Sequence, residues 1–259
     1  MENEQKIDFM SETIVKIKSI LLLILKGNYQ RAWYNIKRKK YLQVDTVEYP
    51  VSLYGNPYNG YRVYDKVIKE KENPIVYSFG IGEDLDFCER INKSFNPEIF
   101  AFDPTPRAID YVKSHYLYNQ HNFHFTPVGL SDKDEKEMFY LPINEKSVSG
   151  SAIIGKHLKN EGFEVEMRCI STLAKERGHN HIDLLKMDVE GSEFKFVEGL
   201  RNCPVLIDQI CMEIHDRGFK DGIDLLKLLL VTMRDLGYLL ISISTSEEEL
   251  TFLKKSVVK

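Results

Sequence analysis

The sequence predicts an α/β protein with a doubly wound, mostly parallel sheet of seven strands and an N-terminal helical extension. Two patterns predict this class. From residue 74 onward, short apolar runs alternate with longer amphipathic segments, and glycine or acidic residues follow most of the apolar runs. Strands that alternate with helices form parallel sheets, because each helix carries the chain back to the same end of the sheet.

The first strand–helix unit begins at residue 75. Residues 75–79 read Ile-Val-Tyr-Ser-Phe, which indicates a buried strand, and Gly80-Ile81-Gly82 follows directly. The next segment is an amphipathic helix, whose apolar positions recur at helical spacing: Leu85, Cys88, Ile91 and Phe95.

Six further apolar runs complete the predicted sheet: 98–102, 123–128, 181–187, 209–214, 238–244 and 249–253. A short polar turn separates the last two runs, so we expect an antiparallel last strand, and we expect these two adjacent strands to form an antiparallel edge of the sheet. Thr105 is expected to cap a helix that begins with Pro106, and Ser171 or Thr172 to cap a later one. Residues 137–141 and 165–170 predict additional short strands.

The residues before this domain predict a separate extension. Residues 11–40 indicate one or two amphipathic helices with a break near Gly27 and Asn28. Residues 41–73 are rich in turn residues and aromatic residues, and we expect no regular element there. The predicted division is therefore an extension over residues 1–73 and a ligand-binding domain over residues 74–259.

Composition and charge exclude several classes of protein. The net charge is -4, and the basic residues concentrate in residues 11–40, so the main body is acidic and nucleic acid is not expected as a partner. Four cysteines without a C-x-x-C pair indicate neither a disulfide framework nor a zinc site. The apolar run at residues 20–25 is too short to span a bilayer. We expect a cytoplasmic protein, in which residues 11–40 pack on the domain or contact a partner protein or the inner face of a membrane.

The residues that follow the strands are the candidates for ligand binding, since open α/β sheets bind ligands at the carboxyl ends of their strands. Gly80 and Gly82 allow a turn to pass close to a ligand. Asp103 ends the next strand, where it could accept hydrogen bonds from two ribose hydroxyls or merely cap its neighbour. Glu83 and Asp84 replace the third glycine of dinucleotide-binding proteins, and their charges would repel a pyrophosphate. A ligand with ribose and without phosphate is therefore favoured.

Five short segments together resemble the FkbM family of S-adenosylmethionine-dependent methyltransferases. They are Lys186-Met187-Asp188-Val189-Glu190-Gly191-Ser192-Glu193, Tyr77-Ser78-Phe79-Gly80-Ile81-Gly82-Glu83-Asp84, Phe102-Asp103-Pro104-Thr105-Pro106, Val148-Ser149-Gly150-Ser151 and Met212-Glu213-Ile214-His215. The resemblance runs from about residue 74 to residue 253. It implies a class I methyltransferase fold and O-methylation of a hydroxyl, often on a sugar or a surface glycan.

The resemblance also implies which residues bind S-adenosylmethionine. The expected cofactor-binding residues are Phe79, Gly80, Ile81, Gly82, Asp84, Asp103, Pro104, Leu130, Ser131 and Asp188. Residues 130–132 would flank the adenine. Ser78 stands where many such enzymes have an acid. Glu83, Asp84 or Asp188 would therefore bind the ammonium group of the cofactor.

Four residues are the candidates for catalysis. His215 is the first candidate for a general base, because a neutral imidazole is readily tuned near physiological pH, although a surface histidine is an equally good interpretation. Asp188, Glu190 and Glu213 follow central strands, and Glu190 could instead cap the next helix. Asp188, Glu213 and His215 could also hold Mg²⁺.

Two other functions stay open from the residues alone. The first is an NAD-dependent oxidoreductase or epimerase, although the third glycine and a Tyr-x-x-x-Lys pair are missing. The second is a module that binds a nucleoside without turnover. The sequence does not name the methyl acceptor.

Overall fold

The computed structural model describes residues 29–44, 48–57, 60–142 and 158–258. Contacts along the chain divide it into two compact units, residues 1–43 and residues 44–259. In the first unit, α2 (Tyr29–Tyr41) forms the second of the helices predicted in the extension. The helix expected from Ser11 to Gly27 lies outside the described residues. No helix among the described residues has the length and apolar character needed to cross a membrane.

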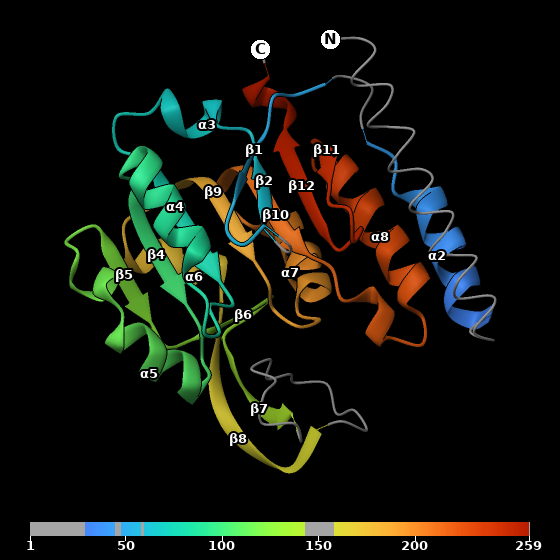
Figure 1. The fold of residues 1–259 in the computed structure, drawn as a ribbon, viewed down its shortest axis with the longest axis horizontal. Coiled ribbons are helices and arrows are strands. Elements are labelled where there is room, and N and C mark those ends of the chain that lie inside the picture. Colours follow the sequence, from blue (N-terminus) through green and yellow to red (C-terminus); the bar gives the residue numbers. More distant parts are fainter. Residues whose placement is uncertain (1–28, 45–47, 58–59, 143–157, 259) are drawn as a thin grey trace. The chain divides into compact units, whose positions relative to one another are not determined.

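The second unit contains the predicted sheet. Among the described residues, seven strands pair in the order β11 (Tyr238–Ile243), β12 (Glu249–Lys254), β10 (Leu206–Glu213), β9 (His181–Met187), β3 (Ile75–Phe79), β4 (Glu98–Phe102) and β5 (Phe123–Thr126) (Figure 1). The last strand, β12, is antiparallel to both of its neighbours, and the pairs from β10 to β5 are parallel. The doubly wound, mostly parallel fold with an antiparallel last strand is confirmed.

The structure adds the order of the two strands at this antiparallel edge, which the sequence did not predict. The antiparallel strand β12 does not form the edge but lies between β10 and β11. Helix α8 (Gly222–Asp235) carries the chain past the position beside β10, and the short turn after β11 then returns it into that position. The sequence shows that the last two strands are neighbours, but not which of them pairs with β10.

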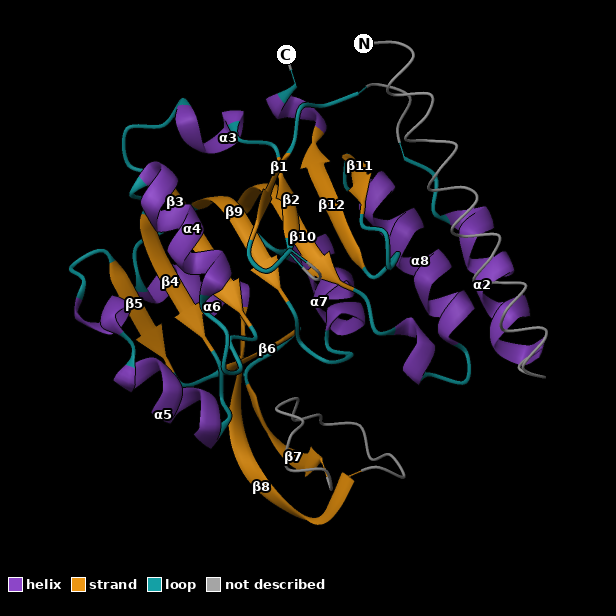
Figure 2. Ribbon diagram, viewed as in Figure 1, coloured by secondary structure: helices purple, strands orange, loops and turns teal. Residues whose placement is uncertain are grey.

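Helices cover both faces of the sheet (Figure 2). Helices α4 (Asp86–Phe95) and α5 (Pro106–Ser114) lead from β3 toward β5, whereas α7 (Glu193–Gly199) leads in the opposite direction from β9 to β10. Right-handed crossovers in opposite directions place these helices on opposite faces. The central strand β9 is buried on both faces, and its two buried charged side chains, Asp183 and Lys186, form hydrogen bonds within the protein.

The predicted helix caps are confirmed in part. Thr105 is at the N-cap position of α5 with Pro106 next, but its hydroxyl donates to Asp103 Oδ1 instead of accepting from the helix. Helix α6 (Ile170–Glu176) begins before the predicted caps Ser171 and Thr172. Its start is fixed from outside, because Asp134 accepts hydrogen bonds from the Cys169 N–H and from the Thr172 hydroxyl.

The expectation that residues 41–73 lack regular structure is wrong. They contain the antiparallel strands β1 (Ser52–Tyr54) and β2 (Tyr61–Val63) and the helix α3 (Lys66–Lys69). The Thr251 hydroxyl donates to the Arg62 carbonyl at 2.6 Å, which ties β2 to the sheet. Residues 44–73 belong to the second unit, which begins at residue 44 and not at residue 74. Elements of three or four residues are too short to show a periodic pattern.

A second sheet of the described residues lies beside the strand ends. It contains β6 (Gly129–Ser131), β8 (Leu158–Cys169) and β7 (Glu135–Pro142), in that order. The strands predicted at 137–141 and 165–170 are present and longer than expected. Residues 129–131, which were expected as a loop after a strand, pair with β8.

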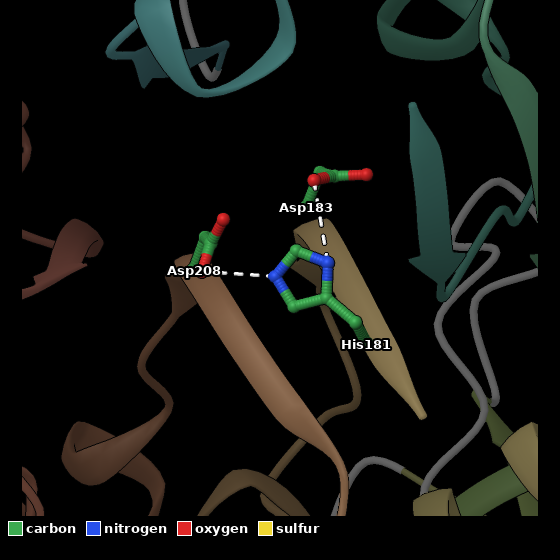
Figure 3. A group of neighbouring side chains, drawn as sticks. All are labelled: His181, Asp183 and Asp208. Atoms are coloured by element: carbon green, nitrogen blue, oxygen red, sulfur yellow. Dashed lines mark ion pairs between the residues drawn. The ribbon is translucent and has the colours of Figure 1, made fainter. Parts of the chain in front are cut away.

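The amino ends of β9 and β10 carry the amino-edge cluster, which consists of Lys71, His181, Asp183 and Asp208. Figure 3 shows the histidine and the two aspartates. His181 Nε2 lies 3.0 Å from Asp208 Oδ1, and His181 Nδ1 lies 3.5 Å from Asp183 Oδ1. Lys71 Nζ lies 3.3 Å from Asp183 Oδ1 and 3.5 Å from Asp208 Oδ2. Asp183 also accepts the Ile75 N–H at 2.7 Å. The cluster therefore joins three segments of the chain.

Candidate active site

The turn after β3 brings the carboxyl ends of three strands together. Gly80 has a φ of 71°, and a Cβ atom at this position would lie 1.6 Å from the Asp188 carbonyl oxygen. Its N–H donates to the Phe102 carbonyl at 3.0 Å. Only glycine permits so close an approach of β3, β4 and β9, so the first glycine of the motif is required by the fold as well as by any ligand.

Asp103 closes the same turn from the end of β4. It is 5% exposed, and it accepts hydrogen bonds from the Gly82 N–H at 2.9 Å, the Thr105 N–H at 2.8 Å and the Thr105 hydroxyl at 2.6 Å. A carboxylate offers about four acceptor positions, so the protein leaves about one of them free. Asp103 therefore fixes its neighbours and keeps about one acceptor position for a ligand, and its contact with a ribose stays a prediction.

The two acids that follow Gly82 have different partners. Glu83 forms an ion pair with Arg107 at the start of α5. Asp84 Oδ1 accepts the Asp86 N–H at 2.7 Å and so caps α4. Arg107 therefore offsets part of the repulsion that Glu83 would exert on a pyrophosphate. The Asp84 side chain lies beside the glycine turn and lines the cavity.

A buried lysine lies beneath the glycine turn. Lys186 is 6% exposed, and its Nζ donates to the carbonyls of Phe79 at 3.1 Å and Gly80 at 2.7 Å. The ammonium group also lies 5.3 Å from the ring centre of Tyr61. A second, small cavity of about 80 Å³ lies here, with Lys186, Tyr61, Asp84 and Asp188 among its lining residues. Sequence reasoning quoted Lys186 only as part of a motif and did not assign it a role.

The strand ends enclose a cavity of about 400 Å³. Nine of the ten expected cofactor-binding residues line it: Phe79, Gly80, Ile81, Gly82, Asp84, Asp103, Pro104, Leu130 and Asp188. Ser131 does not line this cavity, because it is 1% exposed and its hydroxyl donates to Asp132 and Glu135. The lining also includes Phe139 and Met167 from the second sheet, which no motif in the sequence marks.

The predicted catalytic residues meet at one end of this cavity. His215 Nε2 lies 3.4 Å from Glu190 Oε2 and 3.7 Å from both Asp188 Oδ1 and Glu213 Oε1. Its Nδ1 lies 3.4 Å from Glu193 Oε1. We call these five residues the carboxyl-edge cluster. Asp188, Glu190 and Glu213 line the cavity, whereas His215 lies behind them and is not part of the lining.

Glu193 holds the cluster together. Its side chain is fully buried, and its carboxylate accepts the Gly191 N–H at 2.8 Å and the His215 N–H at 2.7 Å. It thereby joins the loop after β9 to the loop after β10. The N-cap position of α7 is occupied by Ser192, so Glu190 is not the helix cap considered from the sequence. Glu190 has a φ of 49°, an unfavourable backbone conformation that is kept where its side chain lines the cavity.

The acids change the protonation of this cluster. Burial alone would lower the pKa of His215, but the carboxylates of Glu193, Glu190 and Asp188 raise it to about 10. Burial and the charge of Asp188 raise the pKa of Glu213 to about 8. His215 is therefore an imidazolium near neutral pH and does not have the free imidazole that a general base needs. Glu213 titrates much closer to neutral pH.

The same groups have the geometry expected for a metal site. One ligand atom each of Asp188, Glu213 and His215 lies within 4.8 Å of the others. Two carboxylates and an imidazole are donors that a divalent cation accepts. His215 would have to lose its proton to become a ligand, and the prediction of Mg²⁺ stays a prediction.

The fold and this cavity define an α/β protein of the class I methyltransferase type, in which a glycine turn and an acid at the end of the next strand frame a nucleoside site. The chain belongs to the FkbM family of methyltransferases, since the model of the methyltransferase FkbM domain matches residues 71–240. It is an S-adenosylmethionine-dependent methyltransferase by this membership.

Two curated proteins are similar to the chain. The 2-O-methyltransferase NoeI of Sinorhizobium fredii is 24% identical over 182 residues, which are 64% of this chain and 74% of NoeI. The probable methyltransferase-like protein 24 of Rattus norvegicus is 28% identical over 142 residues. That match covers 54% of this chain and 32% of the rat protein, so the chain corresponds to about a third of it.

Solved structures are more distant. The fibrillarin pre-rRNA processing protein of Methanococcus jannaschii is 10% identical, with a TM-score of 0.39 over 82% of this chain and 86% of its own. A methyltransferase of Pyrococcus furiosus is 14% identical, with a TM-score of 0.35 over 73% of this chain and 80% of its own. Both TM-scores are low, so the family assignment rests on the sequence match.

Proposed function

We propose that the protein transfers a methyl group from S-adenosylmethionine to a hydroxyl group of a sugar or glycan. The observation that carries this proposal is the carboxyl-edge cluster, because three of its acids line the cavity whose other end is formed by Gly82 and Asp103. Carboxylates accept hydrogen bonds from hydroxyl groups, and they are suited to orient a polyhydroxylated acceptor. The printed name of NoeI, a 2-O-methyltransferase, favours O-methylation.

The residues of the cavity fit S-adenosylmethionine. Asp103 keeps an acceptor position for a ribose hydroxyl, and Gly82 places backbone beside it. The cofactor carries an ammonium group and a sulfonium, and Asp188 Oδ1 is a buried acceptor that has no hydrogen bond in the structure. Asp84 and Lys186 line the small cavity behind the turn, where opposite charges suit the ends of an amino acid. When bound, the cofactor supplies an electrophilic methyl group.

The acids of the cluster orient the acceptor and receive its proton. Glu213 is the base in this proposal, because its raised pKa gives a carboxylate enough basicity to accept a hydroxyl proton near neutral pH. The His215 imidazolium stabilises the ionised acids and fixes their side chains. Positioning of the hydroxyl oxygen by Glu190 and Asp188 supplies a further part of the rate acceleration.

Titration calorimetry tests the cofactor assignment. Binding of S-adenosylmethionine in the micromolar range with no binding of NAD supports it, and the Asp103→Ala variant is expected to bind more weakly. Absence of S-adenosylmethionine binding to the wild-type chain contradicts the proposal. Incubation with candidate glycans, followed by mass spectrometry for a gain of one methyl group, then identifies the acceptor. Repeating this assay with EDTA and with added Mg²⁺ tests the divalent cation.

A further inference from the structure

A groove between α7 and α8 adjoins the carboxyl-edge cluster. It encloses about 370 Å³, and Glu190 and Ser192 line both the groove and the main cavity. The groove continues along α7 to Arg201. At the helical rise of 1.5 Å per residue, the seven residues of α7 correspond to a length of roughly 10 Å.

The groove is lined by apolar side chains together with charged and polar ones. Its apolar lining residues are Phe194, Val197, Phe219, Leu225, Leu228 and Leu229. The rings of Phe194 and Phe219 pack edge to face, with centroids 5.3 Å apart. Ser192 and Thr232 are buried polar residues of this lining, and the Thr232 hydroxyl already accepts a hydrogen bond from Arg201 at 2.9 Å. Lys195 is on the rim, where it pairs with Glu137 at 2.7 Å.

This lining selects the chemistry of an occupant. A sugar ring placed against the six apolar side chains of the groove would lose hydrogen bonds to water that these side chains do not replace. An alkyl or aryl chain would lose none and would remove apolar surface from water. Leu228 is 59% exposed, so the described residues of the second unit leave part of this surface uncovered.

We propose that the α7–α8 groove binds an apolar arm of the methyl acceptor, so that the acceptor is an amphiphile with a hydroxylated head group at Glu190 and Glu213. This inference rests on the proposed function, because it extends the acceptor site of the same cavity. The continuity of the two cavities at Glu190 and Ser192 puts the arm and the head group on one molecule.

Binding of alkyl glucosides to the full chain tests this inference without a known acceptor. Methyl, octyl and decyl β-glucoside are titrated below their critical micelle concentrations, and we expect the affinity to rise at least tenfold from the methyl to the decyl compound. The Leu228→Gln variant should lose most of this gain. Val231→Gln is the matched control, because Val231 is 39% exposed on the same helix and does not line the groove.

Three results overturn the inference. They are an affinity that does not depend on chain length, an equal loss in the Leu228→Gln and Val231→Gln variants, and self-association of the chain that Leu228→Gln abolishes. S-adenosylmethionine binding is measured on the same samples. If the cofactor binds but chain length has no effect, the groove proposal fails and the proposed function stands. If the cofactor does not bind, the proposed function fails, whatever the glucosides show.

Discussion

The two edges of the sheet each carry a histidine among acids, but their charges differ. In the amino-edge cluster, His181 and Lys71 face two aspartates, so basic and acidic groups are equal in number among these residues. In the carboxyl-edge cluster, His215 faces Asp188, Glu190, Glu193 and Glu213, so the acids of this group outnumber the base. Both clusters contain three potential metal ligands within 4.8 Å of one another.

This comparison separates a structural cluster from a binding site. Lys71 already supplies a cation to both aspartates of the amino edge, and the backbone of Ile75 satisfies Asp183 further. At the carboxyl edge the carboxylates repel one another. This repulsion is relieved when a cation binds among them or when one of the groups keeps its proton. The raised pKa values of His215 and Glu213 correspond to retained protons. A cationic cofactor would supply the cation instead. Three predictions test this difference.

The largest effect is expected from Glu213→Gln. The amide keeps the shape of the side chain but cannot accept a proton, so turnover should fall by about 10²- to 10⁴-fold, the usual contribution of a general base. The rate of methyl transfer is compared with that of Asp208→Asn, the matched change at the amino edge, which should leave turnover unchanged. If the Glu213→Gln variant keeps its activity, Glu213 is not the base, and another residue accepts the proton.

An intermediate effect is expected on proton release. A cation bound beside Glu213 and His215 lowers the pKa values of both groups, because it favours the form of the cluster that carries fewer protons. S-adenosylmethionine binding at pH 7 should therefore release protons. Its affinity should rise between pH 6 and pH 8, by up to about tenfold per pH unit for each released proton. Calorimetry in buffers of different ionisation enthalpy measures the release. An enthalpy that is the same in all buffers would show that the cluster does not change protonation.

The smallest effect is expected at His181. The hydrogen bond to Asp208 raises the pKa of His181 above its ordinary value of 6.5. Its stabilising contribution is therefore complete below pH 6.5 and is lost as the pH rises through the folded-state pKa. His181→Gln should lower the free energy of unfolding by about 1 kcal/mol or less at pH 6, and by less at pH 9. Urea unfolding at both pH values measures this difference, and unchanged S-adenosylmethionine binding is the control. A loss that is larger at pH 9 would contradict the sign.

The same contrast explains which parts of the structure the sequence could predict. The bounds of β3, β4 and β9 match the apolar runs residue for residue, because these strands are buried and their pattern is local. Asp103, Asp188, Glu213 and the glycines were found because the carboxyl ends of parallel strands must meet. The hairpin of β1 and β2 was missed, since its strands are three residues long and are fixed by distant partners such as Thr251.

The sequence by itself determined the order of the strands along the chain, the family and most residues of the cavity. The tertiary structure decided the protonation of His215, because that depends on acids up to 27 positions away in the chain and not on the neighbouring residues. It also decided that Lys186 supports the glycine turn and that Glu193 joins two loops. Periodicity records which face of an element is buried, whereas charge and hydrogen bonding depend on which side chains the fold brings within a few ångströms.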